Sequence, residues 1–407
     1  MNIQHQKIDI VLLISVLGLL VMGLLALYSS SSTVITEGYG TNYFFKQLVW
    51  IGIGLVIMTI IIFLPNKLIY ESAYILYGIS LFLLVVVIFF GSVGQGAERW
   101  LRLGPLYIQP SEIAKLTTIL AVARFISQDK INLNTFKDFM IASSFILVPF
   151  IFIVRQPDLG TAMVFGAIAL PMFYWAGLKG SNVLLILMPF FIMLASFQFY
   201  AFLILMIILV LYLAYSRKSK TVSVVNFLAN ISMGLLTPVL WNHLKEYQRN
   251  RIKIFLNPEA DPRGAGYQII QSKVAIGSGG FTGKGFLQGS QTQLRFLPEQ
   301  HTDFIFAVIG EEFGFIGVVI GLVLFFVFLM RGIFIATIVK SRFNSIVAVG
   351  IVTVIAFHVV VNIGMTIGLF PVTGLPLPFL SYGGSALLTN MVMAGILLNF
   401  YKNRYEY

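Results

Sequence analysis

The stretch IVLLISVLGLLVMGLLAL, residues 10–27, decides the class of fold. It is an almost purely apolar run of about 18 residues, close to the length at which one helix crosses the hydrocarbon core of a bilayer. The run is longer than the 7–15 or so residues of a signal-peptide core, and no small-x-small cleavage pattern follows it. We therefore expect it to stay in the protein as a membrane helix.

Similar runs recur through the 407 residues, of which 58% are hydrophobic and only 11% charged. Soluble proteins carry about 25% charged residues. With about 20 residues per crossing, the chain is predicted to be an all-α polytopic membrane protein with a bundle of roughly 10–12 transmembrane helices. The predicted spans lie near 9–28, 45–64, 70–91, 106–127, 138–154, 159–177, 182–198, 200–215, 222–243, 304–330, 344–367 and 380–401.

The basic residues predict the orientation of these spans. In this count Lys and Arg gather in the loops on one side, which the positive-inside rule makes the cytoplasmic side. Both termini are then cytoplasmic. The net charge of +11 is interpreted as orientation and contact with anionic lipid, not as nucleic-acid binding, because no basic run with interleaved aromatic residues occurs outside the loops.

No polar half separates from the apolar runs, so residues 1–407 are predicted to form a single membrane domain. Within it, 244–302 is the one long hydrophilic segment and is predicted to be a large extracytoplasmic loop. The nearly unbroken apolar region 182–215 is predicted to be an inserted helical hairpin, although one long bent helix is the alternative.

The composition excludes several kinds of chemistry. The chain contains no cysteine, which removes thiol catalysis, disulfides and iron–sulfur clusters. Its four histidines are too scattered to show metal-ligand spacing, so no zinc site is predicted. No cofactor is predicted with certainty, and a divalent cation is left open.

The glycine-rich run Gly277–Gly285 resembles a P-loop only superficially. Gly285 follows Lys284 where a P-loop has Ser or Thr, and Ser278 stands where the first glycine belongs. Two interpretations remain. The run is either a turn that joins interfacial segments, or its backbone N–H groups approach an anionic headgroup closely, as glycine permits.

Charged residues inside or beside the spans are the candidates for function, because they are costly in a bilayer. Glu112 and Lys115 share one helix face and can pair, as a structural ion pair or as part of a substrate site. Asp158 precedes an apolar span and is either an N-cap or functional. Arg99 and Trp100 could bind a phosphate and stack on a sugar. The alternative is an ordinary interfacial tryptophan with a neighbouring cation.

Asp303 is the sharpest candidate, because it directly precedes the span that begins at Phe304. Partial desolvation there would raise its pKa toward that of a useful general base. Capping the helix would lower the pKa instead, and the sequence leaves both possibilities open. Asp261 is the rival carboxylate, although Asp-Pro is typical of a turn. Of Glu311 and Glu312, at least one is expected to point inward and pair.

Several long motifs carry a family resemblance. They are Gln109-Pro110-Ser111-Glu112-Ile113-Ala114-Lys115, Gln156-Pro157-Asp158-Leu159-Gly160-Thr161, the glycine-rich region from Asp261 to Gly280, Phe296–Ala307 and Gly374–Ser385. The chain resembles the SEDS family (shape, elongation, division, sporulation) over nearly its whole length. Thr373 stands where some division members have lysine, which favours the elongation branch. Region 180–243 departs from the family pattern, because it holds three predicted crossings instead of one.

The resemblance implies a peptidoglycan glycosyltransferase that polymerises lipid II at the outer face of the bacterial cytoplasmic membrane during cell elongation. Asp303 would be the general base and undecaprenyl pyrophosphate the leaving group. The implied partners are a class B penicillin-binding protein, which is a transpeptidase, and other membrane proteins of the elongation complex. The residues expected to bind substrate are Arg99, Trp100, Glu112, Lys115, Asp158, Lys273, Glu299, His301 and Ser385.

Two functions of other classes compete with this one. A lipid II flippase would also need a polar cavity, but its charges should line both halves of the membrane, whereas the unexplained charges here lie toward one side. A catalytically silent scaffold for a transpeptidase is the second alternative, and it gives no reason for Asp303 to be acidic.

Overall fold

The fold was analysed in a computed structural model, which describes residues 7–37, 42–94, 97–104, 106–216, 219–244, 246–257, 259, 261 and 266–406. Two sequence observations fall outside these ranges. They are the cations Arg217 and Lys218 after the predicted hairpin, and residues 262–265 of the glycine-rich family motif.

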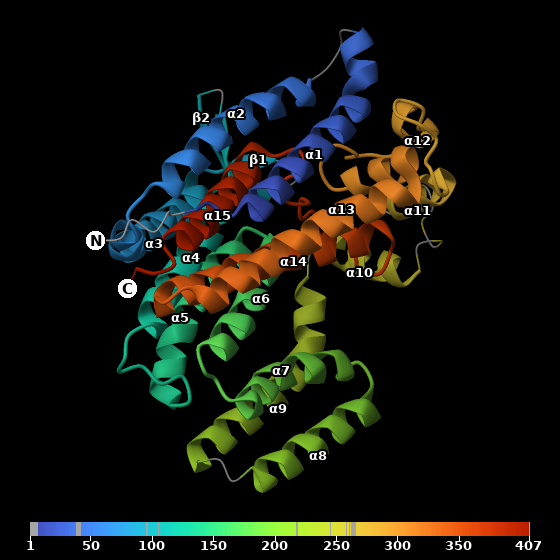
Figure 1. The fold of residues 1–407 in the computed structure, drawn as a ribbon. Coiled ribbons are helices and arrows are strands. Elements are labelled where there is room, and N and C mark those ends of the chain that lie inside the picture. The colour runs from blue at the N-terminus through green and yellow to red at the C-terminus, as the bar shows by residue number, and fades with distance from the viewer. Residues whose placement is uncertain are drawn as a thin grey trace, which may run out of the picture.

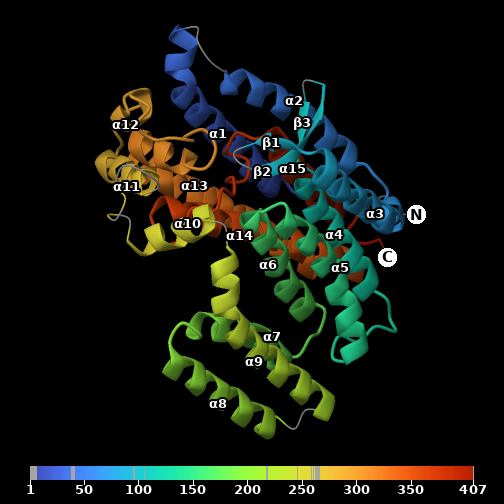
Figure 2. The ribbon, with the colours of Figure 1, turned by 180° about the vertical axis from the view of Figure 1, so that it is seen from behind.

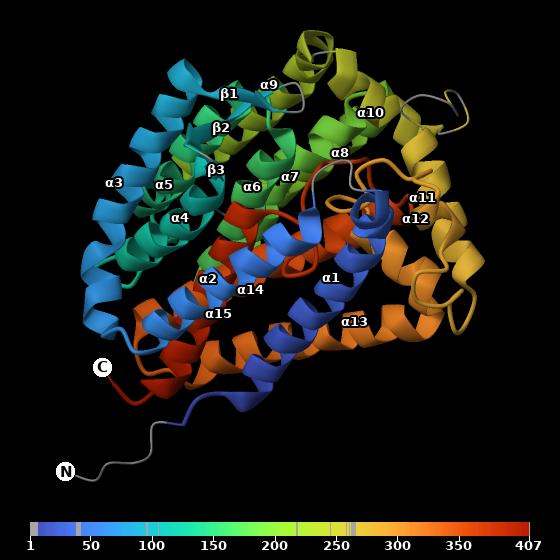
Figure 3. The ribbon, with the colours of Figure 1, turned by 90° about the horizontal axis from the view of Figure 1, so that it is seen from above.

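A bundle of long helices forms the body of the molecule, as predicted (Figure 1). Its members are α1 (Ile10–Glu37), α2 (Tyr43–Ile62), α3 (Asn66–Phe90), α4 (Pro110–Ile126), α5 (Phe136–Arg155), α6 (Leu159–Trp175), α13 (Ile305–Ile338), α14 (Arg342–Thr366) and α15 (Gly384–Lys402). Helices α4, α14 and α15 are the most enclosed, and one continuous apolar core joins the bundle. Both ends of the chain lie at one end of the bundle (Figure 3).

Eight helices of the described chain are long and apolar enough to cross a membrane, and α6, α7 and α8 are shorter apolar helices. Together with α4, they correspond to the predicted spans. The boundaries differ most at α1, which continues to Glu37 rather than ending near 28. At α4 the difference is smaller: the helix begins at Pro110 rather than near 106, because a strand precedes it. The boundaries also differ at α13, which continues to Ile338 rather than ending near 330.

A small antiparallel sheet between α3 and α4 was not predicted. It consists of β1 (Ser92–Gly94), β2 (Ala97–Leu103) and β3 (Leu106–Ile108) in the order β1-β2-β3. Leu101 pairs with Ile108, and a register shift interrupts the pairing near Ser92 and Val93. The strands are short and were hidden within a stretch interpreted as loop and helix end, so their alternation was too brief to detect.

Helices α7 (Gly180–Ala195), α8 (Phe199–Tyr215) and α9 (Lys220–His243) form a lobe beside the bundle (Figures 1 and 2). The lobe has its own small apolar cluster, composed of Leu185, Met188, Ile192, Met206, Leu209 and Leu213. The break between α7 and α8 lies at residues 196–198, so the alternative of one long bent helix is wrong.

Segment 244–302 contains short helices that cover the end of the bundle opposite the termini (Figure 3). They are α10 (Glu246–Leu256), α11 (Tyr267–Gly279) and α12 (Ser290–Gln293). Residues 280–285, which we call the glycine clasp, lie between α11 and α12.

The glycine clasp enters a break in α13. Gly314 has φ 62° and ψ −157°, so the helical hydrogen bonds that Phe315 and Ile316 would donate four residues back are lost. Their N–H groups donate instead to Gly280 O (2.9 Å) and Phe281 O (3.2 Å) of the clasp.

The carbonyls released by the break are satisfied in the same way. Lys284 N donates to Glu311 O (3.0 Å) and Gly285 N to Glu312 O (3.1 Å). At Gly283, where φ is +83°, a Cβ atom would collide with Glu312 O, so glycine is required. The N–H groups of Lys284 and Gly285 are therefore occupied by α13 and are not available to a headgroup.

Side chains strengthen this junction. The fully buried Glu311 carboxylate pairs with Lys284 Nζ (2.8 Å) and accepts hydrogen bonds from the backbone N–H groups of Gln291 and Thr292. Glu312 is also buried, and the Ser29 hydroxyl of α1 donates to it. The expectation that at least one of these two glutamates points inward and pairs is confirmed.

Candidate active site around Asp303

Asp303 lies in the turn immediately before α13. Its backbone N–H donates to Glu299 O (3.1 Å), and Glu299 has a φ of +52°. No side chain caps α13, whose N-cap residue is Phe304. The alternative that Asp303 is simply a helix cap is therefore wrong, and its carboxyl group is available for another role.

The surroundings of Asp303 raise its pKa to about 6. Burial is the largest cause, and the negative charge of Glu299 adds to it. Arg251 of α10 and a hydrogen bond from Thr302 oppose the shift without cancelling it. The carboxyl group is thus mostly ionised at neutral pH yet much more basic than an exposed aspartate, which suits proton abstraction.

Asn362, one of the fully buried residues of α14, fixes the backbone at this position. Its Nδ2 donates to Asp303 O (3.0 Å) and to Leu375 O (2.8 Å). The segment that follows α14 is thereby held beside Asp303. Its Gly374 has a φ of +72°, and Asp303 Oδ2 would lie 3.7 Å from a Cβ atom placed there.

Further bonds join the Asp303 turn to the segment before α15. Ser381 Oγ donates to Thr302 O (2.6 Å), and Tyr382 N donates to His301 O (2.9 Å). These contacts unite parts of the chain that are some 80 residues apart. The local geometry of Asp303 therefore depends on contacts with distant segments as well as on its own turn.

His301 and Glu299 lie next to this carboxyl group. The His301 ring stacks on Tyr43 of α2, with ring centroids 3.9 Å apart, and its Nε2 lies 3.8 Å from a Glu299 oxygen. Burial lowers the pKa of His301, and Glu299 opposes that shift. The stacked pair presents flat, partly exposed rings of the kind on which sugars pack.

Glu112 and Lys115 pair as expected, with Lys115 Nζ 2.8 Å from Glu112 Oε1. Both are nearly fully buried, and Lys115 Nζ also contacts His358 Nε2 (3.1 Å). His358 Nδ1 lies 3.1 Å from Pro376 O, and a carbonyl only accepts, so Nδ1 carries the proton and Nε2 accepts from Lys115. This buried chain connects α4 to the segment that lies against Asp303.

Asp158 caps α6 and also pairs across the molecule. Its two carboxylate oxygens accept from the backbone N–H and the hydroxyl of Thr161, each at 3.0 Å. Arg99 of β2 donates to Pro157 O (2.7 Å), and its Nε lies 3.7 Å from Asp158 Oδ2. Trp100, the next residue, is partly buried. The capping interpretation is thus confirmed for Asp158, and the Arg99 cluster braces the start of α6.

The start of α6 adjoins the Asp303 region, because a Cβ atom on Gly160 would collide with Thr373 O. Ser385 has a different position. Its hydroxyl accepts from Gln109 N (3.2 Å) and donates to Tyr107 O (3.3 Å), which ties α15 to β3. Lys273 is exposed on α11, and its side chain packs on Gly368 at the end of α14.

The structure therefore brings Asp303, Glu299 and His301 into one cluster, and connects Glu112 and Lys115 to it through His358. Three contributors were missed in the sequence: Arg251, His358 and Asn362. His358 and Asn362 carried a detectable signal, since polar side chains within an apolar span need a partner. Across the described ranges, no group of three or more His, Asp or Glu side chains could hold a metal ion.

This fold and site define a class of integral membrane protein, a helical bundle with a partly buried carboxyl group at one end. Comparison with known proteins identifies its family. The family described as "Cell cycle protein" (FtsW/RodA/SpoVE) matches residues 10–203 and 185–406, and the chain belongs to it.

Individual relatives agree with this assignment. The chain is 38% identical to the peptidoglycan glycosyltransferase MrdB of Escherichia coli, covering 98% of this chain and 94% of that protein. It is 36% identical to the peptidoglycan glycosyltransferase RodA of Treponema pallidum, with 96% of each covered.

Solved structures have the same fold. One, from a study of how a peptidoglycan synthase complex coordinates polymerization and crosslinking, has a TM-score of 0.76 and 29% identity over 98% of this chain and 99% of that chain. RodA of Thermus thermophilus has a TM-score of 0.66 and 25% identity over the same shares.

Proposed function

We propose that this protein is a peptidoglycan glycosyltransferase that polymerises lipid II into glycan strands. The observation that carries the proposal is Asp303, whose pKa is raised to about 6 while Asn362 holds its backbone in place. The names of the relatives MrdB and RodA support the same activity.

In the proposed reaction, Asp303 takes the proton from the 4-hydroxyl group of the acceptor sugar. The hydroxyl oxygen then attacks the anomeric carbon of the donor, a new glycosidic bond forms, and the bond to undecaprenyl pyrophosphate breaks. A general base of this kind typically contributes a factor of about a hundred to ten thousand in rate.

The leaving pyrophosphate needs positive charge nearby. Arg251, beside Asp303, and the exposed Lys273 are the proposed contacts. Lys115 is enclosed by Glu112 and His358, and Arg99 braces Asp158. We propose that these two cations hold the surrounding segments in place and do not contact the substrate. A divalent cation could share the charge, but the described residues form no evident site for it.

The proposed activity also implies a membrane location, an orientation and a partner. We propose that the protein lies in the bacterial cytoplasmic membrane with both termini cytoplasmic, so that Asp303 faces the outer side, where segment 244–302 forms an extracytoplasmic cover. A class B penicillin-binding protein is the proposed partner, supported by the similarity to a structure from a peptidoglycan synthase complex. The hairpin within 182–215 is proposed to be an insertion, and the family match divides there into segments that overlap at 185–203.

The test is polymerisation of labelled lipid II by the purified protein with its partner, followed by separation of the glycan products by length. Asp303→Asn is expected to reduce product by a factor of about a hundred to ten thousand. Asp261→Asn, at an exposed aspartate, is the matched control and should remain active. Near-normal polymer from a stable Asp303→Asn protein would remove Asp303 from the mechanism. Lipid II transfer between leaflets without polymer would favour a flippase.

A further inference from the structure

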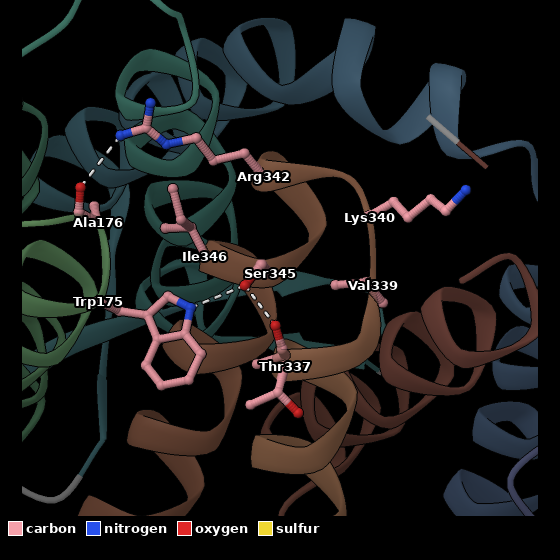
Figure 4. Close-up of a pocket in the computed structure, with 9 residues that line it drawn as sticks. Trp175, Ala176, Thr337, Val339, Lys340, Arg342, Ser345 and Ile346 are labelled. Carbon is pink, nitrogen blue, oxygen red and sulfur yellow. Dashed lines mark hydrogen bonds between the residues drawn. The ribbon is translucent and has the colours of Figure 1, made fainter. Parts of the chain in front are cut away.

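A cavity of about 440 Å³ lies at the end of the bundle opposite Asp303 (Figure 4). It is formed where α6 and α13 end and α14 begins, and it is lined by Trp175, Ala176, Ala336, Thr337, Val339, Lys340, Arg342, Ser345 and Ile346. Helix α13 begins beside Asp303 and ends beside this cavity. The 24 residues of α13 that follow the break at Gly314 alone correspond to about 36 Å at the helical rise. The cavity is therefore separate from the candidate active site.

The charge of the cavity has one sign. Lys340 and Arg342 line it, and no Asp or Glu is among its lining residues in the described chain. A second cavity of about 550 Å³ on the other side of this turn is lined by the same two cations and by Lys67, although Glu406 also reaches it. The turn between α13 and α14 thus presents positive charge to hollows on both of its sides.

The walls of the first cavity combine polar groups held by hydrogen bonds with apolar side chains. Trp175 Nε1 donates to Ser345 Oγ (2.9 Å), which in turn donates to Ala336 O (2.6 Å), so the indole ring is held in place. Arg342 Nη2 donates to Ala176 O (3.2 Å), which uses one of the five guanidinium N–H donors. Val339 and Ile346 supply apolar wall.

These features match the chemistry of a phospholipid headgroup. The cavity lies at the ends of membrane spans, where lipid phosphates are found, and basic pockets between transmembrane helices bind anionic headgroups. Tryptophan is characteristic of this depth because one part of its ring is apolar and the other polar. General attraction to the membrane surface would need only exposed cations, whereas a hollow between helix ends with a fixed indole wall favours one bound lipid.

We propose that this cavity binds the headgroup of an anionic phospholipid, with the phosphate beside Arg342 and the acyl chains along the apolar ends of α6 and α13. Lys340, which extends away from Arg342, adds positive charge at the same turn (Figure 4). Because two hollows flank the same cations, a lipid with two phosphates should bind more tightly than one with a single phosphate. The inference is independent of the proposed glycosyltransferase activity.

The experiment is native mass spectrometry of the purified full chain in detergent, titrated separately with cardiolipin, phosphatidylglycerol and phosphatidylethanolamine. We expect retention in that order. Lys340→Gln combined with Arg342→Gln should weaken cardiolipin binding roughly thirtyfold, from about 1 kcal/mol for each cation near the membrane surface. The matched control is Lys130→Gln with Lys137→Gln, which removes the same charge from two exposed positions, one in the loop between α4 and α5 and one in the first turn of α5.

A second variant tests the hollow rather than the charge. Thr337 is exposed and lines the cavity, so Thr337→Trp should fill it and displace the lipid while leaving both cations in place. Equal loss in the control pair, or undiminished binding in both test variants, would overturn the proposal. Displacement of the lipid by millimolar inorganic phosphate would identify a free-phosphate site instead and also overturn it.

Discussion

Helices α14 and α9 are both long enough to cross a membrane, but they differ sharply in their surroundings. In the most apolar window of α14, 72% of the residues are buried, against 17% in α9. Asn226, Asn230 and Thr237 of α9 donate to carbonyls four residues back in their own helix. Asn362 and His358 of α14 reach other segments instead. In these two helices, the polar residues that reach other segments are the ones that contribute to the candidate site.

The largest effect is expected at the buried Glu112–Lys115 pair of α4, which also contacts His358 of α14. Lys115→Met or Glu112→Gln leaves the other charged side chain buried without its partner, which typically costs 3–5 kcal/mol. Thermal unfolding in detergent should show the loss. The matched control is Lys67→Met, which breaks an exposed pair with Glu71 at 3.8 Å and should cost no more than about 1 kcal/mol.

Reversal of both charges separates a structural role from a substrate role. If the pair is structural, Glu112→Lys combined with Lys115→Glu should restore more polymerisation than either single reversal, as expected for interacting neighbours. The rescue should be incomplete, because the His358 nitrogen that accepts from Lys115 would then face a carboxylate. Recovery of protein level without any recovery of activity would instead indicate that Lys115 serves the substrate.

The next effect concerns the pH dependence of polymerisation at the Asp303 site. Asp303 must be ionised to accept a proton, and its pKa is raised to about 6. The rate should therefore fall as the pH drops through 6, by about tenfold for each further pH unit. The check is a pH profile of polymerisation with protein integrity monitored in parallel. An acid limb centred near pH 4 would show that burial does not control this carboxyl group during turnover.

Asn362 should have a smaller but clear effect. Asn362→Ala removes the donor to two backbone carbonyls, and leaving buried groups unsatisfied costs about 1–3 kcal/mol. If that loss appears in the transition state, polymerisation falls by roughly tenfold to a hundredfold. The comparison variant is Asn230→Ala in the lobe, which is equally buried but bonds only within α9. Equal losses in the two variants would contradict the contrast between the regions.

The sequence was sufficient for features that depend on nearby residues. Apolar length predicted the spans, and the position of Asp303 at the start of one made it a candidate general base, although the sequence left helix capping open. Contacts between distant segments were out of reach. The glycine clasp shows why, because its requirement for glycine at Gly283 depends on Glu312 O of a broken helix. Composition alone could not distinguish that role from a turn or a headgroup site.

The residues of the candidate site also divide into those that the sequence indicated and those that it did not. His301 and Glu299 were within reach because they lie in one motif with Asp303. Asn362 and His358 were missed, since their importance depends on a segment that folds back to place Leu375 and Pro376 beside them. An apolar span gives no sign of which polar residue will meet such a segment.

The smallest effects are expected in the lobe, where the open question is topology. No charged residue lies in 181–216, so substitutions there should leave polymerisation nearly unchanged. If α7 and α8 cross as a hairpin, Gln198→Cys should react with a membrane-impermeant maleimide from outside intact cells and Ser219→Cys only after permeabilisation. The natural absence of cysteine makes both labels specific. Losing the Ser219 cap of α9 costs about 1 kcal/mol, too little to unfold the lobe. Labelling of Ser219→Cys in intact cells would mean that α7 and α8 do not form a transmembrane hairpin, and α9 would then need a different orientation from α14.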